Sequence, residues 1–313
     1  MKIYIIGHTP PDLDTVASTV TYAEYIKKIN RYTDREVVPL YSGNLNNETL
    51  YIFEKFNVQI PAEIKDVHIA ETDNFILVDH NEESQRDPRV NPAKVLEIVD
   101  HHKLNINFTS PIRVDVRPLG STCSIIYELF KTSKIEPEPA TANLILASVL
   151  SDTVGLKSTL TTGIDVTIAH EIAEKHDIDI EQLTVEIFKA KSDIEGLSAY
   201  EIVNRDTKTF DFKGTKVFIG EVETVEPEKV IEQKAGLIEA LEDTKVKKGV
   251  GIAYLFIIDI LNLNALAVYA TDAEREILEK AFTATGSDNV MDIGPRISRK
   301  KDIAPAIERV VTG

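Results

Sequence analysis

Aspartate and histidine side chains gather in three short segments of the first third of the chain. These segments are Gly7–Thr15 (GHTPPDLDT), Asp79–Glu82 (DHNE) and Asp100–Lys103 (DHHK). A further acid, Asp152, follows a strongly apolar stretch. Carboxylate oxygens with some imidazole nitrogen suit hard or borderline divalent ions such as Mn, Mg or Co, whereas structural zinc sites usually recruit thiolates. The pattern therefore predicts a site for divalent metal ions.

The number of candidate ligands favours two ions rather than one. Two or three histidines and four aspartates exceed what one catalytic ion with open positions can use. Two ions about 3.5–4 Å apart would share carboxylates and clamp the attacking and leaving oxygens of a phosphoryl transfer. Taken singly, each residue has an ordinary alternative, which is a capping or core histidine, an Asx turn at Asp12 and Asp14, or a solvated turn at Asp152. An acid at the end of a helix opposes the helix dipole, so Asp152 needs a compensating partner.

Apolar runs that alternate with amphipathic stretches must position these segments. We expect buried strands at Lys2–Ile6, Phe75–Val78 and Val95–Val99, and helices at Thr15–Lys28, Cys123–Phe130 and Pro139–Leu150. Strands separated by helices predict an α/β fold whose N-terminal domain has a mainly parallel sheet flanked by helices. Each Asp/His segment directly follows one of the three strands, and ligand sites of such sheets lie beyond the carboxyl ends of the strands. The three segments are therefore expected to meet at one edge of the sheet.

The pattern changes near residue 190, which predicts a second domain. We expect a metal-binding catalytic domain at 1–190, a linker at 191–196 and a smaller C-terminal α/β domain at 197–313. Further helices are expected at Thr162–His176, Ile180–Lys189, Glu195–Thr207, Glu226–Glu242 and Asp302–Val311, and further strands at Lys216–Glu221, Gly251–Asp259 and Ala265–Ala270.

Two other segments suit phosphate. Arg117–Thr122 precedes an expected helix, whose first amides could bind an anion, and Ser298–Lys301 is a basic run in an acidic protein. An ordinary capped helix and a solvated basic loop are the plain alternatives.

Charge and cysteine content narrow the class of protein. The chain has 313 residues, 35 of them basic and 51 acidic, for a formal net charge of −16. This charge repels nucleic acid and anionic lipid, so we expect neither a nucleic-acid partner nor a membrane partner. The single cysteine, Cys123, excludes an internal disulfide and fits a reducing compartment. Since no apolar run reaches membrane-spanning length and the first residues do not look like a signal peptide, a cytoplasmic location is expected.

Five motifs occur in order along the chain. They are Gly7-His8-x-x-Pro11-Asp12-x-Asp14, Val78-Asp79-His80-Asn81-Glu82, Asp100-His101-His102, Ser151-Asp152 and Ser298-Arg299-Lys300-Lys301. This set resembles that of the manganese-dependent (family II) inorganic pyrophosphatases of the DHH phosphoesterase superfamily. The Asp-His-His motif alone marks only the superfamily, whereas the Asp-His-Asn-Glu and Ser-Arg-Lys-Lys motifs point to the pyrophosphatase branch. The resemblance covers nearly the whole chain.

The resemblance implies a role for each motif residue. One metal ion would be held by His8 and Asp12, the other by Asp14 and His101, and both by Asp79 and Asp152. His102 would face the substrate, while His80 and Asn81 would orient ligands. The phosphoryl groups would be bound from the second domain by Arg299, Lys300 and Lys208, the last of which lies in the looser motif Asp206–Phe210.

The implied reaction is hydrolysis of inorganic pyrophosphate to two orthophosphates. Two or more divalent ions would take part, with Mn expected first and Co or Mg as alternatives. A hydroxide that bridges the ions would attack one phosphorus in a cleft between the domains, and the linker would act as the hinge of that cleft. Two alternatives stay open: a short-chain exopolyphosphatase or another DHH-type phosphoesterase with the same metal site, and a non-catalytic binding protein that kept the fold. The negative net charge disfavours a nuclease, because a nuclease must bind a polyanion.

Three positions depart from the family's motifs. Pro10 and Leu13 supply no ligand, so they are expected to change the stiffness of the loop rather than to remove metal. Asp302 stands where glutamine is usual, and it would either weaken phosphate binding at Lys300 or only cap the last helix. Asp79 comes 64 positions after Thr15, which leaves no room for the nucleotide-sensing insert of some members. Members are often homodimers, so a homodimer is possible here, and no sequence feature fixes the oligomeric state.

Overall fold

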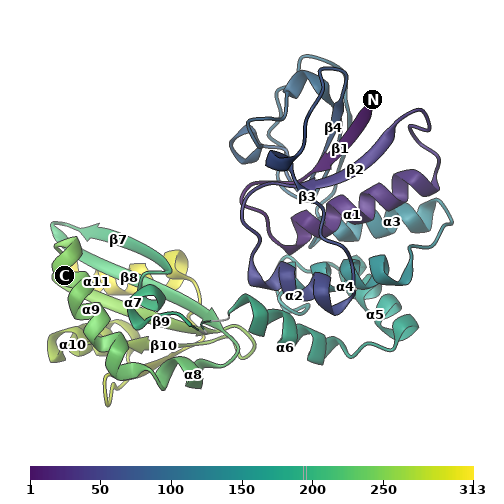
Figure 1. Ribbon diagram of the computed structural model, residues 1–313. Coiled ribbons are helices and arrows are strands. Elements are labelled where there is room, and N and C mark those ends of the chain that lie inside the picture. Colours follow the sequence, from purple (N-terminus) through teal and green to yellow (C-terminus); the bar gives the residue numbers. More distant parts are fainter. Residues whose placement is uncertain (193, 195) are drawn as a thin grey trace. The chain divides into compact units, whose positions relative to one another are not determined.

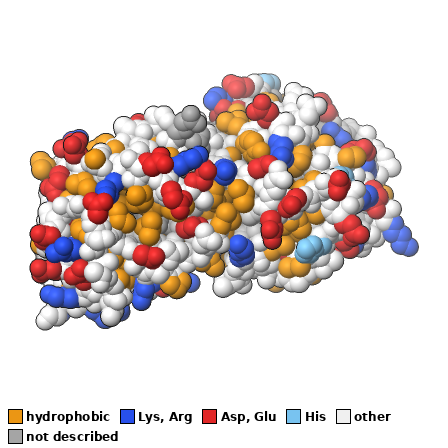
Figure 2. Space-filling model, turned by 90° about the horizontal axis from the view of Figure 1, so that it is seen from below, with side chains coloured by type: hydrophobic (Ala, Val, Ile, Leu, Met, Phe, Trp, Pro, Cys, Tyr) orange, Lys and Arg blue, Asp and Glu red, His pale blue; other side chains and the backbone are white. Residues whose placement is uncertain are grey.

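Residues 1–192, 194 and 196–313 are described by a computed structural model, in which the chain divides into two units, Met1–Lys191 and Ser192–Gly313. The predicted linker at 191–196 includes Asp193 and Glu195, which lie outside the described residues. Acidic and basic side chains are interspersed on the face shown in Figure 2, so the excess negative charge forms no single acidic patch on that face.

The first unit is built on a six-stranded sheet whose strands all run parallel, as predicted (Figure 1). Its strands are β1 (Lys2–Ile6), β2 (Glu36–Tyr41), β3 (Ala62–Glu63), β4 (Asn74–Val78), β5 (Val95–Asp100) and β6 (Arg113–Val116). Their order in the sheet is β3-β2-β1-β4-β5-β6. The chain fills one side of the sheet first and then the other, so the order reverses between β1 and β4, where sheets of this kind place their ligands.

Helices cover one face of this sheet. The helices of the first unit are α1 (Leu13–Lys28), α2 (Asn47–Lys55), α3 (Thr122–Thr132), α4 (Pro139–Asp152), α5 (Gly163–His176) and α6 (Ile180–Lys191). Apolar side chains of α1 and α3 pack on the sheet, among them Tyr22, Ile26 and Phe130. Helix α4 lies against α1 and α3, and it also contacts α2, α5 and α6. The opposite face is covered by connecting segments with short 3-10 turns at Ile64–Asp66, Glu83–Gln85 and Pro92–Lys94.

The second unit has a mixed five-stranded sheet in the order β11-β10-β9-β8-β7. Its strands are β7 (Asp206–Phe212), β8 (Thr215–Thr224), β9 (Ile252–Asp259), β10 (Asn264–Val268) and β11 (Val290–Gly294). Its helices are α7 (Ala199–Val203), α8 (Pro227–Ile231), α9 (Lys234–Lys248), α10 (Asp272–Phe282) and α11 (Ala304–Thr312). One apolar cluster joins α7 and α9 to β8 and β9, through residues such as Leu237, Phe218 and Leu255.

Two helix predictions in this unit are wrong. The helix expected at Glu195–Thr207 is the short α7, and the chain is already in β7 at Asp206, because Thr207 to Phe212 pair antiparallel with β8. Glu195 itself lies outside the described residues. The helix expected at Glu226–Glu242 breaks into α8 and α9, since Gln233 between them leaves the helical conformation at φ −90° and ψ 10°.

Candidate metal centre

Three neighbouring strands deliver the Asp/His segments to one edge of the first sheet. Strand β1 ends just before Gly7, β4 just before Asp79, and β5 at Asp100. Because these strands are adjacent and parallel, their carboxyl ends lie side by side. Asp12 caps the following helix α1, where its carboxylate accepts a hydrogen bond of 2.9 Å from the Thr15 amide. The predicted convergence of the segments is therefore a consequence of strand order.

The side chains form three overlapping groups whose ligand atoms lie within 4.8 Å of one another. The groups are His8 with Asp12 and Asp79, Asp14 with His101 and Asp152, and Asp79 with His101 and His102. Asp79 and His101 each belong to two groups. All six predicted ligands are thus brought together, and His102 lies beside them.

Asp79 lies at the centre of the cluster and its carboxylate is fixed from two helices. It is 1% exposed and accepts hydrogen bonds from Thr15 Oγ1 at 2.7 Å and from Thr122 Oγ1 at 2.9 Å. Its backbone has a left-handed φ of 61°, and its amide donates to Val99 on β5. Gly7 makes room for this arrangement, because a Cβ there would lie 2.2 Å from the Thr15 methyl group. Any side chain at Gly7 would therefore displace a residue that holds Asp79.

Two histidines offer a ring nitrogen to the cluster. Nδ1 of His8 donates to the Pro10 carbonyl at 2.6 Å, and Nδ1 of His101 donates to the Leu119 carbonyl at 3.0 Å. These bonds place a proton on Nδ1, so Nε2 is the nitrogen that can bind a metal ion, as in most metal-binding histidines. Both Nε2 atoms face Asp79, at 3.5 Å for His8 and 3.4 Å for His101. The tautomers therefore suit a cation.

The start of helix α3 does bind an anion, but the anion is a side chain of this protein. The amides of Thr122 and Cys123 donate to the Asp14 carboxylate at 2.7 and 3.1 Å, and the hydroxyls of Ser121 and Ser148 donate to it as well. The prediction that Arg117–Thr122 presents amides to phosphate is therefore wrong. These amides hold a candidate metal ligand in place.

The cluster carries more negative charge than its own histidines offset. Burial, followed by the charge of Asp14, raises the pKa of Asp79 to about 7. Burial and the charges of Asp14 and Asp12 likewise raise the pKa of Asp152 well above its usual range. Burial lowers the pKa of His8, but hydrogen bonds to Asp12 and Asp79 outweigh it and bring the value to about 10. A divalent cation would relieve this repulsion, so the donor set fits bound metal ions.

Sequence reasoning did not single out the role of Asp100. Its carboxylate accepts hydrogen bonds from Nδ1 of His102 at 2.9 Å and from the Asn81 side-chain amide at 2.6 Å. The bond to Asp100 fixes the ring of His102, which is 44% exposed, and raises its pKa. The motif Asp100-His101-His102 gave no indication of this role, because the sequence does not show that Asp100 is completely buried while His102 is exposed.

His80 is separate from the ligand groups. Its Nδ1 donates to the Val78 carbonyl at 3.0 Å, and its buried Nε2 has no hydrogen-bond partner among the described residues. Burial lowers the pKa of His80 to about 4, so the ring is neutral.

The predicted phosphate-binding cations lie in the second unit. Lys208 is exposed on β7, and Arg299 and Lys300 begin a π-helical turn at Arg299–Ile303. The Arg299 guanidinium donates to the backbone oxygen and the carboxylate of Asp206, at 3.1 and 2.8 Å, so the turn is held next to the start of β7. Asp302 accepts a hydrogen bond of 3.0 Å from the Ser298 amide at the start of this turn, whereas the residue that caps α11 is Ile303, which makes no side-chain capping bond.

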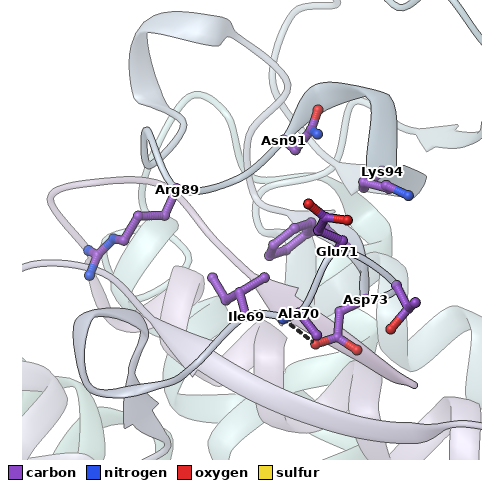
Figure 3. Close-up of a pocket in the computed structure, with 9 residues that line it drawn as sticks. Ile69, Ala70, Glu71, Asp73, Arg89, Asn91 and Lys94 are labelled. Atoms are coloured by element: carbon purple, nitrogen blue, oxygen red, sulfur yellow. Dashed lines mark hydrogen bonds between the residues drawn. The ribbon is translucent and has the colours of Figure 1, made fainter.

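A separate cavity of about 510 Å³ lies at the other ends of the strands (Figure 3). Its lining includes Asp73 and Lys94, which immediately precede β4 and β5, and Asn91, which precedes the short turn before β5. Both oxygens of Asp73 accept backbone amides, and Arg89 is paired with Asp87. Because the cavity lies at the amino ends of the strands and the Asp/His cluster at their carboxyl ends, the two are separate sites.

Comparison with known proteins gives the family. Residues 2–150 match the DHH family N-terminal domain, and residues 185–310 match the DHHA2 domain. A manganese-dependent inorganic pyrophosphatase of Methanocaldococcus jannaschii is 34% identical over 99% of both chains, and a Bacillus licheniformis protein named as a probable enzyme of this kind is 33% identical over 100% of this chain and 99% of its own.

Solved structures agree with this relationship. A Methanococcus jannaschii protein assigned to the family II inorganic pyrophosphatases has a TM-score of 0.63 at 34% identity, covering 99% of this chain and 100% of its own. An exopolyphosphatase-related protein of Bacteroides fragilis shares the fold at 15% identity, with a TM-score of 0.52 over 99% of this chain and 91% of its own. The chain belongs to the manganese-dependent inorganic pyrophosphatases of the DHH family.

Proposed function

We propose that this protein hydrolyses inorganic pyrophosphate to two orthophosphates at the Asp/His cluster. The observation that carries the proposal is the overlap of the three ligand groups, which share Asp79 and His101. Overlapping groups of this kind can hold two cations close enough to act on one phosphoryl group.

The donor set fits manganese. It offers carboxylate oxygens and two imidazole nitrogens with no thiolate, and burial raises the pKa of the Cys123 thiol well above its usual range, so this residue stays a thiol. Bound metal ions would lower the pKa of a water molecule and neutralise charge on the phosphate. Relatives of this chain carry manganese dependence in their names, which supports the same choice here.

The ligands divide between the two cations in a way that the groups support. We assign His8 and Asp12 to one ion and Asp14 and His101 to the other, with Asp79 shared. The first pair forms a group with Asp79, and the second forms a group with Asp152. A second contact of Asp152, to the first ion, follows only from the resemblance.

Side chains outside the ligand set would bind the substrate and move a proton. His102 keeps Nδ1 on Asp100 and has Nε2 left to donate a proton to the departing phosphate. Lys208, Arg299 and Lys300 would bind phosphoryl oxygens and stabilise the charge that develops during transfer. Division of the chain into a metal-binding domain at 1–190 and a substrate-binding domain at 197–313 remains part of this proposal.

Metal-dependent phosphate release tests the proposal directly. The purified chain is stripped of metal, supplied with Mn²⁺, Mg²⁺ or Co²⁺, and assayed on pyrophosphate, tripolyphosphate and ATP. We expect fast Mn²⁺-dependent release from pyrophosphate and slow release from the other two. Preference for tripolyphosphate would replace the substrate with short polyphosphate, and absence of release with every metal would contradict the enzymatic assignment.

Partners and location remain predictions in part. None of the helices within the described parts of the chain has the length and apolar character needed to cross a lipid bilayer. We expect a homodimer without nucleic acid, which light scattering and absorbance of the purified protein would check.

A further inference from the structure

A buried glutamate lies outside the ligand groups. Glu48, the second residue of α2, is 0% exposed. One of its carboxylate oxygens, Oε1, accepts a hydrogen bond from the Ser151 hydroxyl. The other, Oε2, has no hydrogen-bond partner among the described residues and lies 3.8 Å from Nζ of Lys191. Burying a carboxylate with one oxygen unbonded costs free energy, so the burial of Glu48 needs a structural or functional explanation.

The contact to Ser151 reaches the metal centre through one peptide bond. Ser151 and Asp152 are the last two residues of α4, and the Asp152 carboxylate lies 3.9 Å from Nε2 of His101. Asp152 interacts unfavourably with the dipole of α4, because the carboxyl end of a helix repels an acid. Nothing intrinsic to α4 therefore directs this carboxylate toward the cluster. The bond from Ser151 to Glu48 fixes the last turn of the helix from a neighbouring element.

Three helices meet at Glu48. Its own helix α2 packs against α4 and α6, and Lys191 is the last residue of α6. Glu48 thus contacts the end of α4 with one oxygen and approaches the end of α6 with the other. Replacement by glutamine would keep the acceptor oxygen for Ser151 and remove the charge near Lys191, so the two contacts can be tested separately.

We propose that Glu48 is a positioning residue for Asp152 and that it acts through Ser151 to set the affinity of the Asp14–His101–Asp152 group for its divalent cation. This inference rests on the proposed function, since it takes that group to be a metal site. Residues that orient metal ligands typically contribute about 10–100-fold in affinity. A merely structural glutamate would change the free energy of unfolding but leave the Mn²⁺ affinity of the folded protein unchanged.

Mn²⁺ binding to the full-length chain, stripped of metal, tests the proposal without an activity assay. The signal of free Mn²⁺ in electron paramagnetic resonance gives the Kd, and guanidinium unfolding shows that each variant is folded. The variants are Glu48→Ala, Glu48→Gln, Ser151→Ala and the double variant Glu48→Ala/Ser151→Ala. The control is Glu54→Ala, which removes an exposed acid from the same helix.

We expect Glu48→Ala and Ser151→Ala each to weaken Mn²⁺ binding at the Asp14–His101–Asp152 group by about 10–100-fold. The double variant should lose no more than the worse single variant, because both remove the same bond. Glu48→Gln should stay within about threefold of the wild type, like Glu54→Ala, since the amide oxygen still accepts from Ser151.

Two results would overturn this inference and leave the proposed function standing. They are wild-type Mn²⁺ affinity in folded Glu48→Ala, and losses that add in the double variant. If Glu48→Ala does not fold, Ser151→Ala decides by itself, because it removes one hydroxyl and leaves the backbone unchanged. A wild-type chain that binds no Mn²⁺ would overturn the proposed function together with this inference.

Discussion

Arg299 is held between two carboxylates, and this arrangement predicts how pyrophosphate affinity depends on pH. Nε of Arg299 lies 3.4 Å from the Glu221 carboxylate, in addition to its bonds to Asp206, and the side chains of Arg299 and Glu221 are 15% and 12% exposed. If Arg299 binds phosphate as proposed, an ionised Glu221 would compete with phosphate for Arg299 and repel it. Glu221→Gln should therefore lower the KM for pyrophosphate at alkaline pH.

The midpoint of the effect follows from the titration of Glu221. Burial raises its pKa to about 7 against the opposing charge of Arg299, and the charges of Asp206 and Glu223 add to the rise. With that pKa, Glu221 is about 10% ionised at pH 6 and about 90% ionised at pH 8. A charged contact of this kind contributes about 1.5 kcal/mol, or about tenfold in affinity. The ratio of the wild-type KM to the variant KM should rise from about 1 at pH 6 to about 5 at pH 8.

The stability of the wild type should change in the same pH range. A carboxyl group whose pKa is raised on folding contributes stability that is present below its unfolded pKa and is lost as the pH rises through about 7. The melting temperature of Glu221→Gln should therefore gain on that of the wild type between pH 6 and pH 8.

Steady-state assays with saturating Mn²⁺ at half-unit steps from pH 6 to pH 8.5 test this reasoning. The ratio of the two KM values cancels the titration of pyrophosphate itself. Glu223→Gln is the comparison variant, since it removes an exposed acid two residues along the same strand and keeps Glu221. It should keep the pH-dependent KM and lower its midpoint, because the charge of Glu223 contributes to the raised pKa of Glu221. A ratio that does not vary with pH, or a KM that rises in Glu221→Gln at pH 8, would refute the idea that Glu221 competes for Arg299.

Three further predictions concern the metal centre and the second unit. Asp79→Ala should abolish phosphate release, because it removes the carboxylate shared by two ligand groups; measurable turnover would contradict the assignment. Lys300→Ala should raise KM about tenfold while the bound Mn²⁺, counted by atomic absorption, stays at the wild-type level; loss of metal would show that Lys300 supports the cluster instead. Gly7→Ala should lower kcat and weaken Mn²⁺ binding, since the new Cβ would meet the Thr15 methyl group at 2.2 Å, and calorimetry that finds unchanged Mn²⁺ affinity would count against this crowding.

Much of the first unit could be predicted because its signals are local. Strands β1, β4 and β5 are short apolar runs, and the structure places them within one residue of the predicted bounds. A chemical group that directly follows a strand in a parallel sheet has its place fixed by strand order alone, so His8, Asp79 and His101 were expected to lie together. Strand β7 was missed, and the helix before it was predicted too long, because Asp206–Phe212 has little apolar character of its own and becomes a strand by pairing with β8.

By itself, the sequence determined the parallel sheet and which acids and histidines gather at its edge, because periodicity and strand-end position are properties of neighbouring residues. The tertiary structure decided how those side chains are held. Asp14 takes its amides from Thr122 and Cys123, which are 108 and 109 residues away, and Glu48 meets Ser151 across 103 residues. Arg299 reaches Asp206 across 93 residues. Hydrogen bonds of this kind depend on which helices pack together, and no local pattern encodes them.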